Sequence, residues 1–443
     1  MFVKFKKNNK KLQKYANQII PGISGLLGKR PEMYLPGGSW PTYYSKAKGI
    51  NLWDLNGKKY YDFTMVGIGT SVLGYSDEDI NKTAIKAIKS GSMTTLNPPE
   101  DLELAELLLK IHPWADSVRY ARTGGEAMSV AARLSRAYTG RDKILFCGYH
   151  GWHDWYLSAN LKSKKKLNEH LLPGLEPLGV PKGLKGSVIP FRFNNWEDLE
   201  KVVKKNAKKC AAIIMEPCRE TMPHKDYLIE LRKIATKNKC ILIFDEITSG
   251  WRLNTGGSHL KMKVNPDVVV YGKTISNGIP MAAIIGKKEV INFVLKTFVS
   301  SSFWTERVGP SCAITFIKKH QKLKLGNRLN EIGIKIKNIW KKAAKENNLN
   351  IEINGINPLA TFKLHTKNWP VTITYFNQEM LKYNILASDR CYANYKHDDK
   401  SLNKYQKACH TIFEKISYFE KKEILDKKLE GPIKQMGFKR LTY

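Results

Sequence analysis

The stretch ILIFDEITSGWR, residues 241–252, is a short apolar run that ends in two carboxylates, Asp245 and Glu246. A second stretch, DVVVYGKTISNGIPMAAIIG (267–286), holds two apolar runs, and the first of them ends at Lys273. Continuous apolar runs of this length, closed by polar residues, are typical of strands buried on both faces. Such strands, predicted at 117–122, 143–148, 211–217, 240–246, 267–273 and 282–288, alternate with helical stretches, including Glu126–Tyr138 and Tyr227–Lys239. This alternation predicts an α/β fold with a mostly parallel sheet covered by helices.

The regions on either side of these runs predict smaller units. The string GINLWDLNGKKYYDFT (49–64) alternates apolar and polar residues around Asn56-Gly57, which predicts an antiparallel hairpin. A mostly helical pattern, a second hairpin and two amphipathic stretches follow the large domain, at 309–347, 351–365, 376–384 and 401–430. We therefore expect an N-terminal segment with a small antiparallel unit, a large α/β domain and a smaller α+β domain, at residues 1–75, 76–315 and 316–443.

The composition is that of a globular protein. The chain has 443 residues, of which 42% are hydrophobic and 26% are charged, and this excludes wholesale disorder and fibrous repeats. The seven cysteines are scattered and never form a CxxC pair, so neither a disulfide framework nor a metal site is expected. No apolar run approaches the ~18 residues of a membrane span, and no signal-peptide core is found. We expect a cytoplasmic protein.

The net charge of +34 raises the question of a polyanionic partner. The surplus is almost all lysine, 60 Lys against 14 Arg, in short runs mixed with Asn and Ile. Nucleic-acid sites favour Arg forks and aromatic platforms, and the chain has no zinc-finger spacing or RNA-binding signature. Dispersed surface lysines are the simpler explanation, and no nucleic-acid partner is expected.

Three features of the large domain suggest chemistry when they are taken together. A predicted strand ends at Thr123-Gly124-Gly125 and opens into a helix, where backbone N–H groups and the helix dipole favour an anion. Asp245 ends a buried strand at the edge where open α/β sheets bind ligands. Lys273 ends the next buried strand, where loss of water would lower its pKa and make it a reactive amine.

Each of these features also has an ordinary structural explanation. A glycine pair before a helix is often just a tight turn, an aspartate at a strand end often caps the next turn, and a lysine there often extends to solvent. Their order along one chain favours the chemical interpretation. An anion cradle, an acid for a ring nitrogen and an amine for a carbonyl are what pyridoxal 5′-phosphate (PLP) requires.

At these residues the sequence resembles class III aminotransferases among the fold type I PLP enzymes, and most closely their glutamate-1-semialdehyde aminomutase-like branch. The resemblance runs from about Gly49 to the C-terminus. Five motifs occur in the family's order: RTGGEA (122–127), GYHGWHDWY (148–156), FDEITSGWR (244–252), YGKTISNG (271–278) and FWTERVGP (303–310).

The resemblance implies a role for each matched residue. It makes Lys273 the lysine that binds PLP covalently and moves the proton, and Asp245 the partner of the pyridine nitrogen. It implies that Thr123, Gly124 and Gly125 form the phosphate turn, that Tyr149 stacks on the cofactor ring, and that Glu216 lies near the ring's hydroxyl. It matches Thr305 to a threonine that reaches the phosphate of a neighbouring subunit, which implies a homodimer with shared active sites.

The substrate side of the resemblance is weaker. Position 125 is Gly where many class III members have Thr, and the segment 35–49 has no clear match to the aminomutase arginine that binds the substrate carboxylate. Four residues are candidates for the substrate pocket: Trp40, His153, Arg219 and Arg252. Core packing for the aromatic residues and structural ion pairs for the arginines remain open alternatives.

These observations predict a PLP-dependent aminotransferase that moves an amino group from a small-molecule donor to a carbonyl metabolite. The acceptor is expected to be anionic, for example a keto-sugar or another precursor of a surface polysaccharide. Glutamate-1-semialdehyde 2,1-aminomutase activity is the first alternative, and decarboxylation or racemisation with the same cofactor is another. A more distant alternative is a basic polyanion-binding protein on a retired enzyme scaffold.

Overall fold

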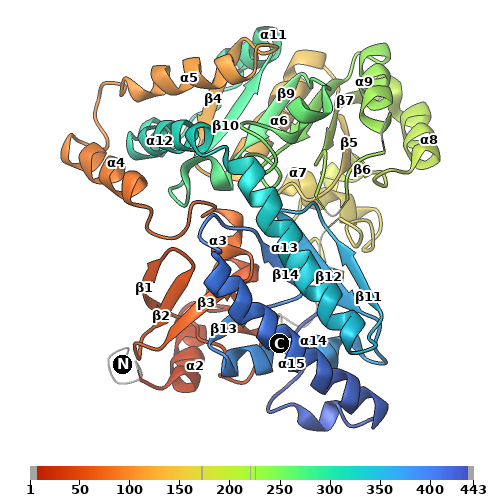
Figure 1. Ribbon diagram of the computed structural model, residues 1–443. Coiled ribbons are helices and arrows are strands. Elements are labelled where there is room, and N and C mark those ends of the chain that lie inside the picture. The colour runs from red at the N-terminus through yellow and green to blue at the C-terminus, as the bar shows by residue number, and fades with distance from the viewer. Residues whose placement is uncertain (1–6, 171–172, 220, 225, 438–443) are drawn as a thin grey trace. The chain divides into compact units, whose positions relative to one another are not determined.

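The computed structural model describes residues 7–170, 173–219, 221–224 and 226–437 (Figure 1). The chain packs into two compact units. One consists of Glu78–Asn327, and the other combines the N-terminal residues up to Asp77 with the residues from Arg328 onward. Helix α12 (Val308–Lys322) crosses the expected boundary at 315/316 and packs on α4 (Glu78–Lys89) and α5 (Glu100–Ile111) in the first unit. The domain boundaries named above stay predictions.

The unit Glu78–Asn327 is built on a seven-stranded sheet in the order β4-β10-β9-β8-β7-β5-β6. Strand β10 is antiparallel to both of its neighbours, and the other strand pairs are parallel, so the predicted mostly parallel sheet is confirmed. The bounds are β4 Ser117–Ala121, β5 Lys143–Cys147, β6 Val188–Pro190, β7 Cys210–Met215, β8 Ile241–Asp245, β9 Val268–Tyr271 and β10 Ala282–Gly286.

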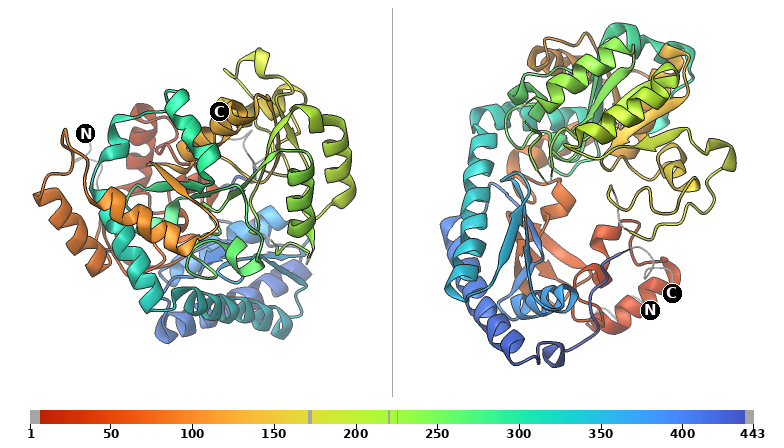
Figure 2. Two further views of the ribbon diagram at one scale, coloured as in Figure 1. Left: turned by 90° about the horizontal axis from the view of Figure 1, so that it is seen from above. Right: turned by 90° about the vertical axis from the view of Figure 1, so that its right-hand side faces the viewer.

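Helices cover this sheet and so bury its central strands. All residues of β7, β8, β9 and β10 are buried. Helix α6 (Gly124–Thr139) packs on β4 and on β7 to β10. Helix α8 (Trp196–Asn206) packs on β5, and helix α9 (Tyr227–Lys237) packs on β8 (Figures 1 and 2). Shorter helices complete the unit: α7 Asp154–Leu157, α10 Ser258–Met262 and α11 Lys288–Ile291.

The second unit has two smaller sheets. One has the order β1-β2-β3-β13, and the other has the order β11-β12-β14. The predicted hairpins at 49–64 and 351–365 are the antiparallel pairs β2·β3 and β11·β12. The bounds are β1 Tyr44–Lys48, β2 Asn51–Asp54, β3 Lys59–Phe63, β11 Ile351–Asn354, β12 Leu359–Leu364, β13 Ile385–Ala387 and β14 Arg390–Tyr392; α2 Asn9–Ile19, α3 Val66–Gly69, α13 Leu325–Glu346, α14 Trp369–Lys382 and α15 Asp399–Lys421.

One expected element differs in detail from the structure, and one strand was not expected. The single helical pattern expected at 309–347 is two helices, because Lys324 takes a left-handed backbone conformation (φ 46°) between α12 and α13. Strand β6 was not expected, and it includes Pro190. Proline is tolerated there because β6 lies at the edge of the sheet.

Candidate active site

The carboxyl ends of five strands meet at one edge of the seven-stranded sheet. Strands β5, β7, β8 and β9 are mutually parallel, and β4 runs in the same direction because both β4 and β9 pair antiparallel to β10. Asp245, the last residue of β8, pairs in register with Val270 of β9. Gly272 follows Val270 by two residues. Residues that follow these strands therefore converge, as ligand-binding residues do in open α/β sheets.

The N-terminus of α6 lies at this edge and is built as a capping box. Thr123 is the N-cap residue: its hydroxyl accepts from the Glu126 backbone N–H at 3.4 Å, and Glu126 Oε2 accepts from the Thr123 N–H at 2.9 Å. The backbone N–H groups of Gly124 and Gly125 have no hydrogen-bond partner among the described residues. A side chain at Gly124 would lie 2.8 Å from Ile247 Cδ1, so the glycine permits this close approach.

Asp245 is 2% exposed, and its two carboxylate oxygens have different partners. Oδ1 accepts from the Ile247 backbone N–H at 3.0 Å, and Oδ2 accepts from His150 Nδ1 at 2.8 Å. Burial raises the pKa of Asp245, and the hydrogen bond from His150 acts against that rise. Such a carboxylate favours a cationic partner.

His150 is a site residue that the sequence reasoning missed. The residue is 1% exposed, and Nε2 is buried with no partner among the described residues. It belongs to the motif GYHGWHDWY (148–156), but a histidine in a loop carries no signal of its contact with a carboxylate 95 residues away. Only the packing of β5 beside the neighbouring strands brings the two side chains together.

Lys273 follows β9 and is partly buried. Its backbone is left-handed (φ 46°), which is uncommon for a residue with a side chain, and Nζ donates to Thr248 Oγ1 at 2.9 Å. Burial lowers the pKa of Lys273 to about 8, and the positive charges of Arg219 and Arg252 act in the same direction. The amine is therefore far more often neutral at pH 7 than an ordinary lysine.

Glu216 connects the loops after β5 and β7. Its Oε2 accepts from the Tyr149 backbone N–H at 3.0 Å and pairs with Arg219 Nη1 at 3.3 Å. A side chain at Gly148 (φ 115°) would lie 2.8 Å from the same oxygen, so the glycine lets the turn approach the carboxylate. Burial raises the pKa of Tyr149, and the charge of Asp245 adds to that rise. The charge of Asp245 therefore reaches Tyr149, whose backbone is held by Glu216.

The remaining candidates for the substrate pocket lie in different places. Arg252 is fully buried, and its Nε donates to the Thr248 carbonyl at 2.6 Å, so it adjoins the residue that holds the Lys273 amine. His153 lies against Gly125. Trp40 is 6% exposed and stacks on Tyr34 with ring centroids 4.4 Å apart, inside the core of the other compact unit. Core packing accounts for Trp40.

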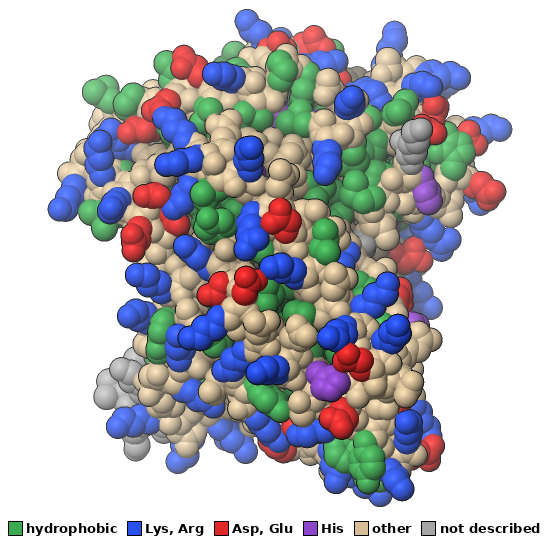
Figure 3. All heavy atoms as spheres, viewed as in Figure 1, with side chains coloured by type: hydrophobic (Ala, Val, Ile, Leu, Met, Phe, Trp, Pro, Cys, Tyr) green, Lys and Arg blue, Asp and Glu red, His purple; other side chains and the backbone are tan. Residues whose placement is uncertain are grey.

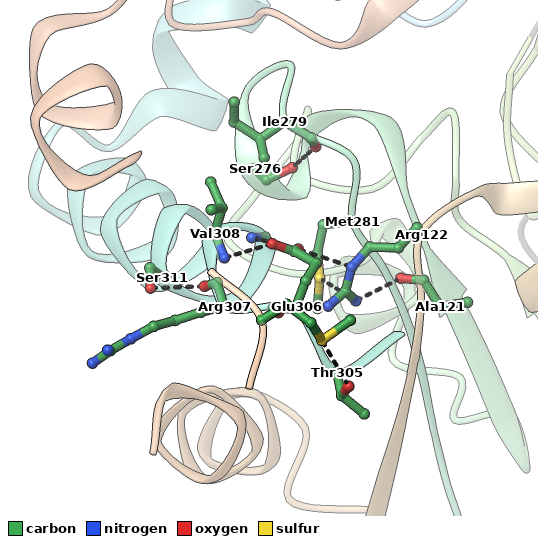
Figure 4. A network of polar contacts seen from close by, with 12 residues as sticks. Ala121, Arg122, Ser276, Ile279, Met281, Thr305, Glu306, Arg307, Val308 and Ser311 are labelled. Atoms are coloured by element: carbon green, nitrogen blue, oxygen red, sulfur yellow. Dashed lines mark hydrogen bonds and ion pairs between the residues drawn. The ribbon is translucent and has the colours of Figure 1, made fainter. Parts of the chain in front are cut away.

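Thr305 is exposed and lies beside a largely buried ion pair (Figure 4). Arg122 Nε is 2.9 Å from Glu306 Oε1, and Arg122 Nη2 donates to the Glu306 carbonyl at 2.7 Å. Glu306 also accepts from the backbone at the start of α12. The Thr305 hydroxyl itself donates to the Ser302 carbonyl at 3.2 Å and contacts the sulfur of Met93. The anchored Glu306 fixes the position of this exposed threonine.

The residues at the edge of the sheet fit PLP. The two unpartnered N–H groups at Gly124 and Gly125 suit a phosphate, the buried carboxylate of Asp245 suits a protonated ring nitrogen, and the amine of Lys273 suits the cofactor's aldehyde. The fold and this set of groups define a PLP-dependent transferase of fold type I.

Comparisons with known proteins agree with this class. The profile of the Aminotransferase class-III family matches residues 35–367. The 3-aminobutyryl-CoA aminotransferase of Cloacimonas acidaminovorans is 28% identical over 87% of this chain and 92% of its own. The glutamate-1-semialdehyde 2,1-aminomutase of Nitrosopumilus maritimus is 34% identical over 72% of this chain and 74% of its own. The structure of the PLP internal aldimine form of the Sphingopyxis sp. MTA144 FumI protein superposes with a TM-score of 0.84, at 21% identity over 93% of this chain and 97% of that one.

The chain belongs to the class III aminotransferase family. It is a PLP-dependent enzyme of the aminotransferase and aminomutase type, as the motifs predicted. Membership of this family does not favour the alternative of a polyanion-binding protein on a retired enzyme scaffold. On the face seen in Figure 3, Lys and Arg side chains are scattered among acidic ones. Within the described ranges, none of the helices combines the length and the apolar character needed to cross a membrane.

Proposed function

We propose that this enzyme is a homodimeric aminotransferase whose carbonyl substrate carries a negative charge. The observation that carries the substrate proposal is the charge around Lys273. Arg252 Nε donates to the carbonyl of Thr248, whose hydroxyl accepts from Lys273 Nζ, and Arg219 pairs with Glu216 at 3.3 Å. The positive charges of both arginines lower the pKa of Lys273. Arginine is suited to carboxylate and phosphate groups because its planar fork can donate two parallel hydrogen bonds.

The cofactor is held by residues of the sheet edge and the first turn of α6. The N–H groups of Gly124 and Gly125 bind its phosphate, with Thr123 fixing the start of the helix. Tyr149 packs on the ring, and Glu216 supports it by accepting from the Tyr149 N–H. A cofactor that lacks the phosphate should therefore bind to this enzyme much more weakly than PLP.

The catalytic work is divided between Lys273 and Asp245. Bound PLP supplies an aldehyde for the amine and a ring that stabilises negative charge on the adjacent carbon. Asp245 holds a proton on the ring nitrogen, and the N–H groups of Ile247 and His150 keep its carboxylate oriented. Lys273, with Nζ held by Thr248 and partly neutral near pH 8, removes and returns the proton at the substrate Cα.

The acceptor is a carbonyl compound with a carboxylate, a phosphate or a sugar nucleotide's diphosphate. The sequence favoured a keto-sugar, and the relative named 3-aminobutyryl-CoA aminotransferase adds acyl-CoA compounds to the candidates. The test is a screen of donors and acceptors of each type, monitored through the visible absorbance of the cofactor. We expect Arg219→Gln and Arg252→Gln to raise KM for the anionic acceptor more than for a neutral analogue. An equal rise for both would refute the charge argument.

The second candidate is glutamate-1-semialdehyde 2,1-aminomutase. The Nitrosopumilus maritimus relative that carries this name is 34% identical to the chain, and the sequence lacks a clear match to the aminomutase substrate arginine. An aminomutase converts its substrate with no external donor, whereas an aminotransferase consumes one. Turnover of glutamate-1-semialdehyde by enzyme freed of added amino acids would replace the first proposal.

The surface around Thr305 supports a homodimer. Thr305 is exposed, and so are Phe298 (93%) and Phe303 (69%) in the same stretch of sequence. Leu96, three residues from the Met93 that Thr305 contacts, is 80% exposed. The Arg307 backbone N–H donates to the Ser92 carbonyl at 2.8 Å, so the segments before α5 and before α12 lie side by side. A second copy that covers this surface would remove apolar area from water and bring Thr305 to the partner's phosphate turn.

Subunit mixing tests the shared site. Lys273→Ala and Thr305→Trp chains each lack a complete site, but their heterodimer has one complete site if Thr305 acts across the interface. Mixing should restore borohydride-reducible PLP binding and activity. The control pairs Lys273→Ala with Asp245→Ala, two residues of one chain's site, and should restore nothing. Failure of the first mixture would refute the shared site.

A cytoplasmic location is part of the proposal. The seven cysteines are free and buried, as is usual for proteins of reducing compartments. Fractionation of the producing cell, followed by detection of the borohydride-reduced enzyme, tests this.

A further inference from the structure

The loop that follows β5 packs directly on the first turn of α6. A side chain at Gly151 (φ 100°) would lie 3.1 Å from the Cα of Gly125. A side chain at Gly125 would in turn lie 2.9 Å from His153 Cε1 and 3.0 Å from His153 Nδ1. Both glycines are therefore needed for this contact, and the imidazole of His153 lies where a side chain of residue 125 would begin.

The edge of the ring that faces Gly125 includes a buried nitrogen. His153 Nδ1 is shielded from solvent and has no hydrogen-bond partner among the described residues. A buried polar nitrogen without a partner costs free energy, so such a group calls for an explanation. Beside it lies Gly125, in the turn whose Gly124 and Gly125 N–H groups also have no partner among the described residues.

The ring of His153 stacks on a neighbouring aromatic side chain, and its backbone is fixed by hydrogen bonds. Trp152 stacks on it, with ring centroids 4.5 Å apart and planes 23° from parallel. The His153 carbonyl accepts from the Tyr156 and Leu157 N–H groups at 2.9 and 3.1 Å, which fixes the backbone at the start of α7. The stack and the fixed backbone restrict the directions in which the imidazole can point.

We propose that His153 is a phosphate ligand: its Nδ1–H donates to a phosphate oxygen of PLP beside the N–H groups of Gly124 and Gly125. This assignment rests on the proposed position of the phosphate at the start of α6. In this arrangement the buried nitrogen of His153 has a hydrogen-bond partner. His153 also supplies a side-chain donor to the phosphate turn, where Gly125 has no side chain. It also moves His153 from the substrate pocket to the cofactor site.

The chemistry of the imidazole agrees with this role. Burial lowers the pKa of His153, while the negative charges of Glu126 and Asp154 act against that shift. A neutral imidazole can carry its single proton on Nδ1 and donate it. A nearby phosphate favours a protonated ring as well, and in that form Nδ1 also donates, so the contact persists in either state.

The test compares PLP with pyridoxal, which lacks the phosphate, in titrations of the cofactor-free enzyme followed by tryptophan fluorescence. His153→Phe keeps an aromatic ring against Gly125 and Trp152 but removes the donor. We expect it to weaken PLP binding by roughly tenfold or more, the effect of a hydrogen bond to a charged group, and to leave pyridoxal binding unchanged. His153→Asn, which can place an amide N–H near Nδ1, should restore part of the affinity.

Gly125→Ala provides a second, independent route. Its methyl group would displace the imidazole, so the loss of PLP affinity in Gly125→Ala should not add to the loss in His153→Phe when the two are combined. Unchanged PLP affinity in His153→Phe, or an equal loss for PLP and pyridoxal, would overturn the role of His153. If the unmutated enzyme itself bound PLP no better than pyridoxal, the proposed phosphate position would fail instead.

Discussion

The ionisation of Lys273 makes a quantitative prediction about how the cofactor-free enzyme takes up PLP. Only the neutral amine attacks the aldehyde. With a pKa of about 8, roughly one amine in ten is neutral at pH 7, against about one in three thousand for an ordinary lysine. The rate of covalent PLP uptake should therefore rise about tenfold between pH 7 and pH 9 and then level off.

The assay mixes enzyme and PLP rapidly at each pH and follows the visible absorbance of the adduct, with borohydride trapping and mass spectrometry to confirm Lys273. The α-amino-blocked lysine, measured in the same buffers, corrects for the ionisations of PLP itself. A roughly hundredfold rise over the same range with no plateau, as a pKa near 10.5 requires, would refute the reasoning.

A change of charge near the amine tests the cause of the shift. Because the positive charge of Arg219 lowers the pKa of Lys273, Arg219→Gln should move the midpoint of the uptake profile to higher pH. Arg192 is a matched control, since it is an exposed arginine paired with Glu169, and Arg192→Gln should leave the midpoint where it is.

Three further predictions concern the support of the site, its packing and the surface charge. His150→Phe removes a hydrogen bond to buried Asp245, so kcat should fall roughly 10- to 100-fold with little change in PLP affinity. His150→Asn should recover part of the lost kcat. A loss of PLP affinity with unchanged kcat would contradict this. Gly250→Ala places a methyl group 2.5 Å from the Glu246 carbonyl and should lower the free energy of unfolding by about 2 kcal/mol. Gly183→Ala, whose methyl group would meet nothing within 4 Å, should leave the free energy of unfolding unchanged. Urea titration measures both variants. The surplus of +34 should make kcat/KM for an anionic substrate fall as salt is added, and a flat profile would show that the charge does not steer substrate.

The strand ends show how far sequence patterns reach. Apolar runs followed by glycine or a charged residue placed the ends of β8 and β9 within two residues of those in the structure, and Asp245 and Lys273 with them. The direction of β10 could not be predicted, because an apolar run buried on both faces looks the same in either orientation. Whether an isolated aromatic lies in a core or at a pocket could not be predicted either, and the structure places Trp40 in a buried cluster with Tyr34.

The two histidines of GYHGWHDWY show where sequence reasoning stopped. Residues 150 and 153 lie in one short loop, yet His150 meets the buried carboxylate of Asp245 and His153 meets Gly125 at the start of α6. No local periodicity distinguishes them, because the difference comes from which neighbouring element each ring packs against.

The amino-acid sequence by itself determined the kinds of elements, their order and the chemical groups at their ends, because side-chain periodicity and turn residues act over a few positions. It also contained the family motifs in order. Only the tertiary structure decided which groups meet: parallel strands place their carboxyl ends at one edge, so Asp245 contacts a histidine 95 residues earlier. The lowered pKa of Lys273 is likewise tertiary, since it comes from burial and from charges contributed by two other loops.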